Sequence, residues 1–407
     1  MAEPTNTPVP ASTPRSASPV HPGGPNTPIV PIMMTSSLPP TTSSPSSHSR
    51  QPSYHHRPRV LHIGDPVRYN PATYIALCGQ CEVIRPSAPE RERGEFIRAL
   101  RERRWGDFHA VLRPFWGSGG EMGNWDEELI SLLPPSVRVF ASAGAGFDWA
   151  DTKLLGERGI IYCNSGLACA EAVADFAVAM IISTFRHLPW CIGAASSGDP
   201  AAFATCHRDA TARSHNLRGH VLGIVGLGNV GQQIAARCRH GFGMEIHYYD
   251  VAAISPDVES ALGGVIARHP SLESLIRASD CVVLCAPAAP GGTSARPLIG
   301  TEQLSWFSDG GRLVNVARGS LVDDEAVADA LEAGKLLSAA LDVHPNEPHV
   351  SARLRALAVA GRVMLSCHNA GGTVETHRGF EELSMRNVMA VLSGGNPITP
   401  VNLEYLR

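Results

Sequence analysis

The sequence predicts an α/β protein with two Rossmann-like domains, each built on a doubly wound parallel sheet. The chain has 407 residues, which is longer than one hydrophobic core usually supports, so two domains are expected. Short apolar segments typical of buried strands alternate with helical segments in two series, the first beginning at Arg59 and the second at Val221. This alternation indicates parallel strands joined by crossover helices. A glycine-rich turn at residues 226–231, early in the second series, is typical of a nucleotide-binding sheet.

The first series combines short apolar strands with two helical segments. The predicted strands are residues 60–63, 82–84, 110–112, 137–140 and 160–162, and the predicted helices are residues 90–104 and 170–187. A polar stretch that contains Gly and Ser, residues 193–216, separates this series from the next one.

The second series is the more regular of the two. Its predicted strands are residues 221–225, 245–250, 281–284, 313–316, 339–342 and 363–366, and a helix at residues 230–240 follows the first strand. Six strands with short crossovers fit a single doubly wound sheet.

The first 57 residues differ in composition from the rest of the chain. They are rich in Pro, Ser and Thr and have little apolar periodicity. Such a segment buries too little surface to offset the entropy lost on ordering, so we expect a disordered extension. Two other interpretations remain open. The segment weakly resembles a mitochondrial transit peptide, because it has few acids and contains Arg15 and Arg50, or the natural start is at Met33 or Met34.

Composition excludes several classes of function. The net charge of −4 gives no electrostatic footprint for nucleic acid or for anionic membranes. The longest apolar stretch, residues 172–185, is too short to span a bilayer and contains Asp175. The ten cysteines lie largely within apolar runs, which suits free thiols in a reducing compartment, so a cytoplasmic protein is expected. Cys78 and Cys81 form one CxxC pair, which is half of a tetrahedral metal site, and we predict no metal.

The strongest local motif is a GxGxxG turn in the context that a dinucleotide requires. An apolar strand precedes it, a helix follows it, and Asp250 ends the next strand, 24 residues after the first glycine (250 − 226). Glycines permit the tight turn and a close approach of the pyrophosphate to the helix N-terminus. A carboxylate at Asp250 binds ribose hydroxyls and repels a 2′-phosphate, so NAD is favoured over NADP. The residues predicted to form the cofactor turn are Gly226, Gly228, Asn229, Val230 and Gly231.

Four polar residues lie at or after predicted strand ends in the second series. They are Arg318, Asp342, Glu347 and His368. Taken singly, each has an ordinary explanation, such as a surface charge, a helix cap or a loop histidine. Their joint placement at the edge where open α/β sheets bind ligands favours a catalytic site.

At this point the sequence resembles the D-isomer-specific 2-hydroxyacid dehydrogenase family, over about residues 59–400. The stretches that carry the resemblance are Ser142-Ala143-Gly144-Ala145-Gly146-Phe147-Asp148, Glu171-Ala172-Val173-Ala174-Asp175, LRGHVLGIVGLGNVG, NVARGSLVDDEAV, AALDVHPNEP and SCHNAGGT. Several separate motifs in the family's order are far more specific than one glycine turn.

The resemblance implies a role for each matching residue. His368 looks like the general acid that protonates the substrate carbonyl oxygen during reduction, and Glu347 like the partner that holds the imidazole and favours its charged form. Arg318 matches the arginine that binds the substrate carboxylate and polarises the carbonyl. The backbone N–H groups of Ala145 and Gly146 are expected on the other side of that carboxylate.

The resemblance also implies the cofactor groove and the domain organisation. Asp342 and the Val316 carbonyl look like the nicotinamide carboxamide contacts, and Thr293 and Pro287 are expected to line the groove. The family's fold has the cofactor domain inserted into a flavodoxin-like substrate domain. The predicted parts are the extension 1–57, the substrate domain 58–165 and 369–407, and the NAD domain 166–368. The C-terminal helix, near residues 375–395, is expected to return to the substrate domain. A homodimer with contacts near residues 170–187 is expected.

The function implied is hydride transfer between NAD(H) and a small 2-oxo acid or D-2-hydroxy acid, similar to glyoxylate or hydroxypyruvate reductases. The alternative is an NAD-sensing corepressor-like binding module, because the same fold serves enzymes and such modules. The His-Asn-Ala sequence at residues 368–370 slightly resembles the corepressor branch of the family. Cys367 stands where the family usually has proline, so a looser loop is expected. Arg113 could contact a polar substrate tail, but a surface salt bridge is favoured.

Overall fold

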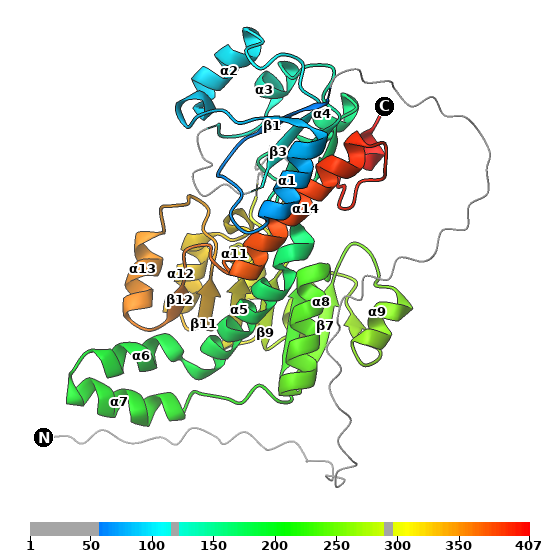
Figure 1. Cartoon of the computed structure of the whole chain (residues 1–407). Coiled ribbons are helices and arrows are strands. Elements are labelled where there is room, and N and C mark those ends of the chain that lie inside the picture. The colour runs from blue at the N-terminus through cyan, green and yellow to red at the C-terminus, as the bar shows by residue number, and fades with distance from the viewer. Residues whose placement is uncertain (1–56, 115–121, 289–295) are drawn as a thin grey trace, which may run out of the picture. The chain divides into compact units, whose positions relative to one another are not determined.

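The computed structural model of the protein describes residues 57–114, 122–288 and 296–407. Two parallel sheets, of five and seven strands, form this part of the chain (Figure 1), which confirms the predicted fold class. The predicted N-terminal extension lies outside the described residues apart from Arg57, and Thr293 lies outside them as well. The domain bounds given above remain a prediction.

The first sheet has the strand order β2-β1-β3-β4-β5, which is the flavodoxin-like order. Its strands are β1 Arg59–His62, β2 Glu82–Ile84, β3 Ala110–Arg113, β4 Val139–Ser142 and β5 Ile161–Cys163. The helices between them are α1 Pro71–Gln80, η1 Pro89–Arg91, α2 Arg93–Arg101, α3 Glu127–Ser131 and α4 Thr152–Glu157. Helix α2 is shorter than the predicted 90–104, because Glu92 is extended before it and Arg103 has a left-handed backbone after it.

Both faces of the first sheet are covered. Large aromatic side chains, among them Phe96, Trp125 and Phe140, pack on one face. On the other face Met385 and Val388 come from α14, Val374–Leu392, the long helix near the end of the chain. The C-terminal segment therefore packs against β3 and β4 (Figure 1), and the short turn η4 Leu403–Tyr405 follows it.

The second sheet has the order β12-β11-β10-β9-β6-β7-β8, the dinucleotide-binding order extended by one strand. Its strands are β6 Val221–Val225, β7 Glu245–Tyr249, β8 Ala267–Arg268, β9 Cys281–Leu284, β10 Gly311–Asn315, β11 Leu336–Leu341 and β12 Val363–Leu365. The sequence predicted six strands. The seventh, β8, is an exposed edge strand of two residues, too short to produce an apolar pattern.

Helices connect the strands of the second sheet. They are α8 Asn229–Ala236, which continues into a π-helical turn Arg237–Gly241, α9 Pro256–Ala261, α10 Leu272–Ala278, α11 Thr301–Ser305, α12 Asp324–Glu332 and α13 Ala352–Val359, with a short turn η3 Gly319–Leu321.

Helix α5, Gly166–Arg186, connects the two sheets in the chain and packs beside both. Cys169 and Val173, near its start, pack with Ala143 of the first sheet's loops and Phe380 of α14. Further along, Met180 and its neighbours join the core of the second sheet. The helix is long and apolar enough to cross a membrane, but half of its most apolar window is buried inside the protein, as expected for a core helix.

The polar stretch 193–216 forms a helical hairpin that the sequence did not reveal. Helix α6 is Leu188–Ser196 and helix α7 is Pro200–Thr211 (Figure 1). Gly198 turns the chain with a positive φ of 70°, the Asp199 side chain accepts a hydrogen bond from the Ala201 amide, and Pro200 opens α7. Gly198, Asp199 and Pro200 therefore separate two helices and do not belong to a long loop.

His62, at the end of β1, gives the fold a specific pH dependence. The side chain is fully buried, with Nε2 3.0 Å from the Asp65 carbonyl oxygen and Nδ1 3.2 Å from the Tyr74 hydroxyl. Burial lowers the pKa of His62 to about 4. Because the unfolded chain binds this proton near pH 6.5, unfolding becomes more favourable as pH falls from about 6.5 to about 4.

We predict that His62 lowers the free energy of unfolding by about 3 kcal/mol as the pH falls from about 6.5 to about 4. Below pH 4 this residue causes no further loss. Denaturant unfolding of the wild type and of His62→Gln at several pH values measures the difference. The variant is expected to be less stable at pH 7 but to have a shallower pH dependence. Parallel pH profiles for the two proteins would contradict the prediction.

Candidate functional site

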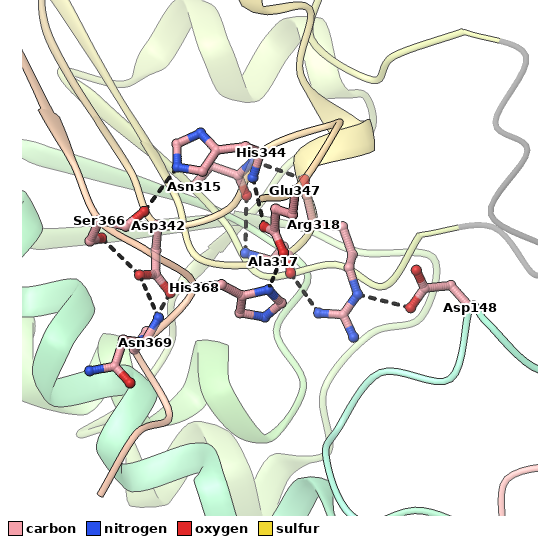
Figure 2. A network of polar contacts seen from close by, with 11 residues as sticks. Asp148, Asn315, Ala317, Arg318, Asp342, His344, Glu347, Ser366, His368 and Asn369 are labelled. Carbon is pink, nitrogen blue, oxygen red and sulfur yellow. Dashed lines mark hydrogen bonds and ion pairs between the residues drawn. The ribbon is translucent and has the colours of Figure 1, made fainter. Parts of the chain in front are cut away.

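The carboxyl ends of β10, β11 and β12 carry the predicted polar residues. The Asp342 amide, just after β11, donates to the Asn315 carbonyl oxygen at the end of β10, at 3.0 Å. The His368 amide, after β12, donates to the Asp342 carbonyl oxygen at 2.7 Å. These backbone bonds extend the sheet by one step beyond its strands. The segments that carry Arg318, Asp342 and His368 therefore lie side by side (Figure 2).

His368 and Glu347 form a direct pair. Their Nδ1 and Oε2 atoms lie 2.8 Å apart, and the other carboxylate oxygen accepts a hydrogen bond from the His344 amide at 2.9 Å. Burial alone would raise the pKa of Glu347, but the hydrogen bonds from His368 and from the His344 backbone outweigh it and hold the pKa below its usual value. Glu347 is therefore an anion at neutral pH and orients the imidazole through Nδ1.

The backbone of the His368 loop is held by Asp342. His368 has a φ of 52°, a left-handed conformation that residues other than glycine adopt only where the surroundings impose it. The buried Asp342 carboxylate accepts hydrogen bonds from the Asn369 and Ala370 amides, both at 2.9 Å, and from the Ser366 hydroxyl at 2.7 Å. These bonds anchor both sides of the loop that contains Cys367. The predicted nicotinamide contact of Asp342 remains a prediction.

Arg318 extends from a rigid turn after β10. The buried Asn315 side chain accepts from the Ala317 amide at 3.0 Å and donates to the Arg318 carbonyl oxygen at 2.9 Å. Gly319 lies so close to the next loop that a Cβ there would come within 1.9 Å of the His344 carbonyl carbon. The Arg318 turn is thereby packed directly against the loop that carries Glu347.

The Arg318 side chain reaches the loop after β4. Its Nε donates to Asp148 at 2.9 Å and its Nη1 to the Ala317 carbonyl oxygen at 2.7 Å. A Cβ on Gly146 would come within 1.0 Å of Nη2, so the guanidinium occupies the space that any side chain at residue 146 would need. The structure therefore brings Arg318 against the Ala145-Gly146 segment, and the binding of a substrate carboxylate between them remains a prediction. Asp148 belongs to a motif that the sequence showed, but its partner lies 170 residues away and no local signal links the two.

Two further polar side chains, those of Arg113 and Asn164, contact this loop. Arg113 is buried at the end of β3, with its guanidinium 4.2 Å from the centre of the Trp149 ring, so the prediction that it lies on the surface is wrong. The Ala145 carbonyl oxygen accepts a hydrogen bond from the Asn164 side chain at 2.8 Å, which ties the carboxylate-binding loop to the segment that leads into α5. Pro287 is exposed, after β9.

The glycine turn has the geometry of a phosphate cradle. Gly226 has a φ of 88°, and a Cβ there would come within 2.8 Å of the Ala286 backbone. A Cβ on Gly231 would come within 2.3 Å of the Gly226 carbonyl oxygen. In contrast, a Cβ on Gly228 would meet open space, and Gly228 precedes Asn229 and Val230 as a helix N-cap without a side-chain hydrogen bond. The first N–H groups of α8 therefore face a space where an anion can bind.

Asp250 lies at the end of β7, next to this turn. Its Oδ2 accepts a hydrogen bond from the Leu227 amide at 2.7 Å, and its Oδ1 accepts from the Ala252 amide at 3.2 Å. One carboxylate therefore fixes the turn relative to the neighbouring strand. The combination of open helix N-terminus, glycine turn and strand-end carboxylate fits a dinucleotide.

Comparisons with known proteins agree with this geometry. A 4-methyl-2-oxopentanoate reductase A of Aspergillus oryzae is 33% identical over 313 residues, which cover 77% of this chain and 89% of the relative. The chain belongs to the D-isomer-specific 2-hydroxyacid dehydrogenase family. The family model for its NAD binding domain matches residues 178–370. A glyoxylate reductase of Thermococcus kodakarensis is 34% identical over 69% of this chain and 81% of the relative.

Solved structures give the same result. A D-mandelate dehydrogenase of Rhodotorula graminis superposes with a TM-score of 0.79 at 41% identity, covering 85% of this chain and 97% of that one. Membership in this family makes the chain an oxidoreductase that acts on 2-hydroxy acids or the corresponding 2-oxo acids. These relatives give no support to the corepressor-like alternative.

We expect different outcomes from alanine substitutions at two glycines of this turn, Gly228 and Gly231. Gly228→Ala places a methyl group in open space, so we expect unchanged thermal stability but an NADH affinity at least roughly tenfold weaker, because the group stands where the phosphates approach. Gly231→Ala forces the methyl group against a backbone carbonyl, so we expect a loss of roughly 1–3 kcal/mol of stability in addition to weaker binding. NADH fluorescence titration and calorimetry measure the two effects. Wild-type affinity in Gly228→Ala would rule out a phosphate site at this helix end.

Proposed function

We propose that the protein is an NAD-dependent reductase of small 2-oxo acids, of the glyoxylate or hydroxypyruvate kind, which forms D-2-hydroxy acids. The observation that carries the proposal is the His368–Glu347 pair, 2.8 Å between Nδ1 and Oε2, at the strand ends of a dinucleotide-type sheet beside Arg318. A proton donor and a carboxylate-binding cation at this edge suit the reduction of a carbonyl next to a carboxylate.

Arg318 is the proposed binding group for the substrate carboxylate. Its hydrogen bonds to Asp148 and Ala317 use two of the five N–H groups of the guanidinium, which leaves others for a substrate. The two bonds also fix the plane of the guanidinium. We assign the backbone N–H groups of Ala145 and Gly146 to the other side of the carboxylate, because Nη2 of Arg318 lies directly against Gly146.

His368 is the proposed proton donor. Since Nδ1 faces Glu347, Nε2 is the ring nitrogen left to face the substrate carbonyl oxygen. NADH bound at the glycine turn would supply a hydride. His368 donates its proton to the carbonyl oxygen of the substrate. In the oxidative direction the neutral imidazole takes the hydroxyl proton. Glu347 holds the imidazole in this orientation through its contact with Nδ1.

The cofactor proposed is NAD, with Gly226, Gly228 and Gly231 forming its pyrophosphate turn and Asp250 its ribose contact. Val316, Pro287 and Asp342 are proposed to complete the groove. The Asp250 carboxylate disfavours a ribose 2′-phosphate by charge repulsion. The Arg268 side chain donates hydrogen bonds to the Asp250 and Val251 carbonyl oxygens at 3.1 and 3.4 Å. It is a nearby cation that could bind the 2′-phosphate of NADP. A lower kcat/KM with NADH than with NADPH would contradict the proposed preference for NAD.

A panel of 2-oxo acids with NADH tests the function. We expect turnover of glyoxylate or hydroxypyruvate, and the panel includes 4-methyl-2-oxopentanoate and phenylglyoxylate, the oxidised form of mandelate, because of the relatives' activities. His368→Ala should retain NADH binding and lose roughly 10²- to 10⁴-fold in kcat. Chiral analysis of the product should give the D-hydroxy acid. An L-product, or NADH binding without turnover of any acid, would overturn the proposal.

The hydrogen bond between Glu347 and His368 is expected to be required for fast reduction. Glu347→Gln keeps a hydrogen-bond acceptor for Nδ1 but replaces the charged acceptor with a neutral one. We expect kcat to fall on the order of 10²-fold at pH 7.5, with little change in KM because Arg318 binds the substrate. Glu325→Gln, an exposed acid paired with Arg353, is the matched control. A wild-type kcat in Glu347→Gln would contradict the role of Glu347.

We also propose that the enzyme is a homodimer with contacts on α5 and its flanks. The α6–α7 hairpin, directly after α5, exposes the large apolar side chains of Ile192 and Phe203, 63% and 57% exposed, which supports an interface there. Light scattering coupled to size-exclusion chromatography should give twice the mass of 43.3 kDa. A monomer at micromolar concentration would exclude it.

The proposed location is the cytoplasm, on the basis of ten free thiols. A transit peptide in residues 1–57 would instead direct the protein to mitochondria. Cell fractionation with an antibody to the folded part distinguishes the two locations.

A further inference from the structure

His344 connects the two segments that carry the His368–Glu347 pair. Its backbone N–H donates to Oε1 of Glu347 at 2.9 Å, and its ring Nε2 lies 2.9 Å from the Ser366 carbonyl oxygen. Ser366 stands two residues before His368 in the chain, and Figure 2 shows the His344 ring turned toward it. One residue therefore binds the carboxylate with its backbone and the histidine segment with its side chain.

The surroundings of the His344 ring fix its tautomer. A carbonyl oxygen only accepts hydrogen bonds, so Nε2 carries a hydrogen and donates it to Ser366. The residue is 5% exposed, and its Nδ1 is buried without a hydrogen-bond partner among the described residues. A hydrogen on Nδ1 would be buried without an acceptor, which costs free energy. The tautomer with its hydrogen on Nε2 is therefore favoured, and the ring makes one directed hydrogen bond.

We propose that His344 is a positioning residue for proton transfer, which sets the position of His368 relative to Glu347 through the hydrogen bond of its ring to Ser366. The inference rests on the proposed function, in which His368 donates the proton. It goes further because it assigns the geometry of the pair to a residue that touches neither the substrate nor the imidazole.

The backbone of residue 344 is a fixed support for the ring. Gly319 packs against it so closely that a Cβ on this glycine would overlap the His344 carbonyl carbon and the Pro345 nitrogen. No side chain fits between the Arg318 turn and residue 344. The ring therefore extends from a backbone that the neighbouring turn holds in place, and it can pass this fixed position on to Ser366.

Other bonds of Ser366 keep its segment folded without His344. Its amide donates to the Leu341 carbonyl oxygen at 3.0 Å, and its hydroxyl donates to Asp342 at 2.7 Å. Both partners precede the loop that carries Glu347, so the His344 ring is the contact of Ser366 that lies nearest to this carboxylate in the chain. Loss of the ring bond should therefore shift the His368 segment relative to Glu347 and leave the sheet intact.

The expected cost is in rate and not in substrate binding. A neutral hydrogen bond contributes only about 0.5–1.5 kcal/mol to stability. In contrast, a catalytic group displaced by about 1 Å can lose on the order of 10²-fold in rate. Arg318, the proposed carboxylate-binding group, is held separately by Asp148 and Ala317, so KM should change little.

Three substitutions separate the hydrogen bond from the shape of the ring. His344→Phe keeps a ring without a donor, and we expect kcat to fall roughly tenfold with less than about a twofold change in KM. Its Tm should fall by less than roughly 5 °C. His344→Gln places an amide N–H near the position of Nε2 and should restore kcat to within roughly threefold of wild type. His344→Asn, whose amide is one methylene closer to the backbone, should not restore it.

Three kinetic results would overturn the proposal. They are a wild-type kcat in His344→Phe, a kcat in His344→Gln no higher than in His344→Asn, and a raised KM at unchanged kcat, which would place the effect in substrate binding. The comparison of Gln with Asn remains decisive if His344→Phe does not fold. Kinetics are measured with the 2-oxo acid that the wild type reduces best.

A readout without substrate separates this inference from the proposed function. Long-range ¹H–¹⁵N spectra of the full-length protein with labelled histidine should show His344 with its hydrogen on Nε2. The His368 signals, assigned with His368→Ala, should shift in His344→Phe and return in His344→Gln. Identical His368 signals in wild type and His344→Phe would contradict the positioning role. These shifts in a protein that reduces no 2-oxo acid would count against the proposed function alone.

Discussion

The buried Asp342 carboxylate is the constraint on which the catalytic edge depends. Three hydrogen bonds to it, from two loop amides and a serine hydroxyl, hold the chain in the left-handed turn at His368. Its own backbone links the ends of β10 and β12. A buried anion of this kind is tolerated because its oxygens are satisfied, and such bonds to a charged acceptor each contribute about 1.5–3 kcal/mol. The imidazole can then remain partly exposed, where substrate reaches it, without losing its position.

A second constraint joins this edge to the other sheet. Arg318 belongs to the turn after β10, whereas Asp148 and Gly146 belong to the loop after β4. The ion pair lies where the substrate carboxylate is proposed to bind, so the protein's own carboxylate shares the guanidinium with the ligand's. Because Asp148 takes Nε and Ala317 takes Nη1, the guanidinium has a fixed orientation before substrate arrives. Fixed orientation reduces the entropy that binding would otherwise lose.

The sequence predicted both sheets and the cluster at their strand ends, because apolar alternation and strand-end polar residues are local patterns. It did not predict groups whose partners are distant in the chain. Asp148 pairs across 170 residues, and the buried position of Arg113 depends on the Trp149 ring after the next strand. The α6–α7 hairpin was hidden for another reason. Its turn contains Gly, Asp and Pro in a stretch of polar composition, and only a cap and a positive φ distinguish such a turn from a loop.

The cofactor end of the site follows the same logic as the catalytic end, with a carboxylate that fixes backbone. The Asp250 carboxylate accepts a hydrogen bond from the Leu227 amide. The glycine turn and β7 therefore cannot separate without breaking this bond. The same carboxylate is proposed to meet the ribose, which requires one group to serve fold and ligand at once. Because of this dual use, we expect that loss of the carboxylate alone does not convert a preference for NAD into one for NADP. Removing the carboxylate also releases the turn that presents the helix N-terminus to the phosphates. A substitution that favours NADP must therefore keep a hydrogen-bond acceptor for the Leu227 amide and leave room for Arg268 to bind the 2′-phosphate.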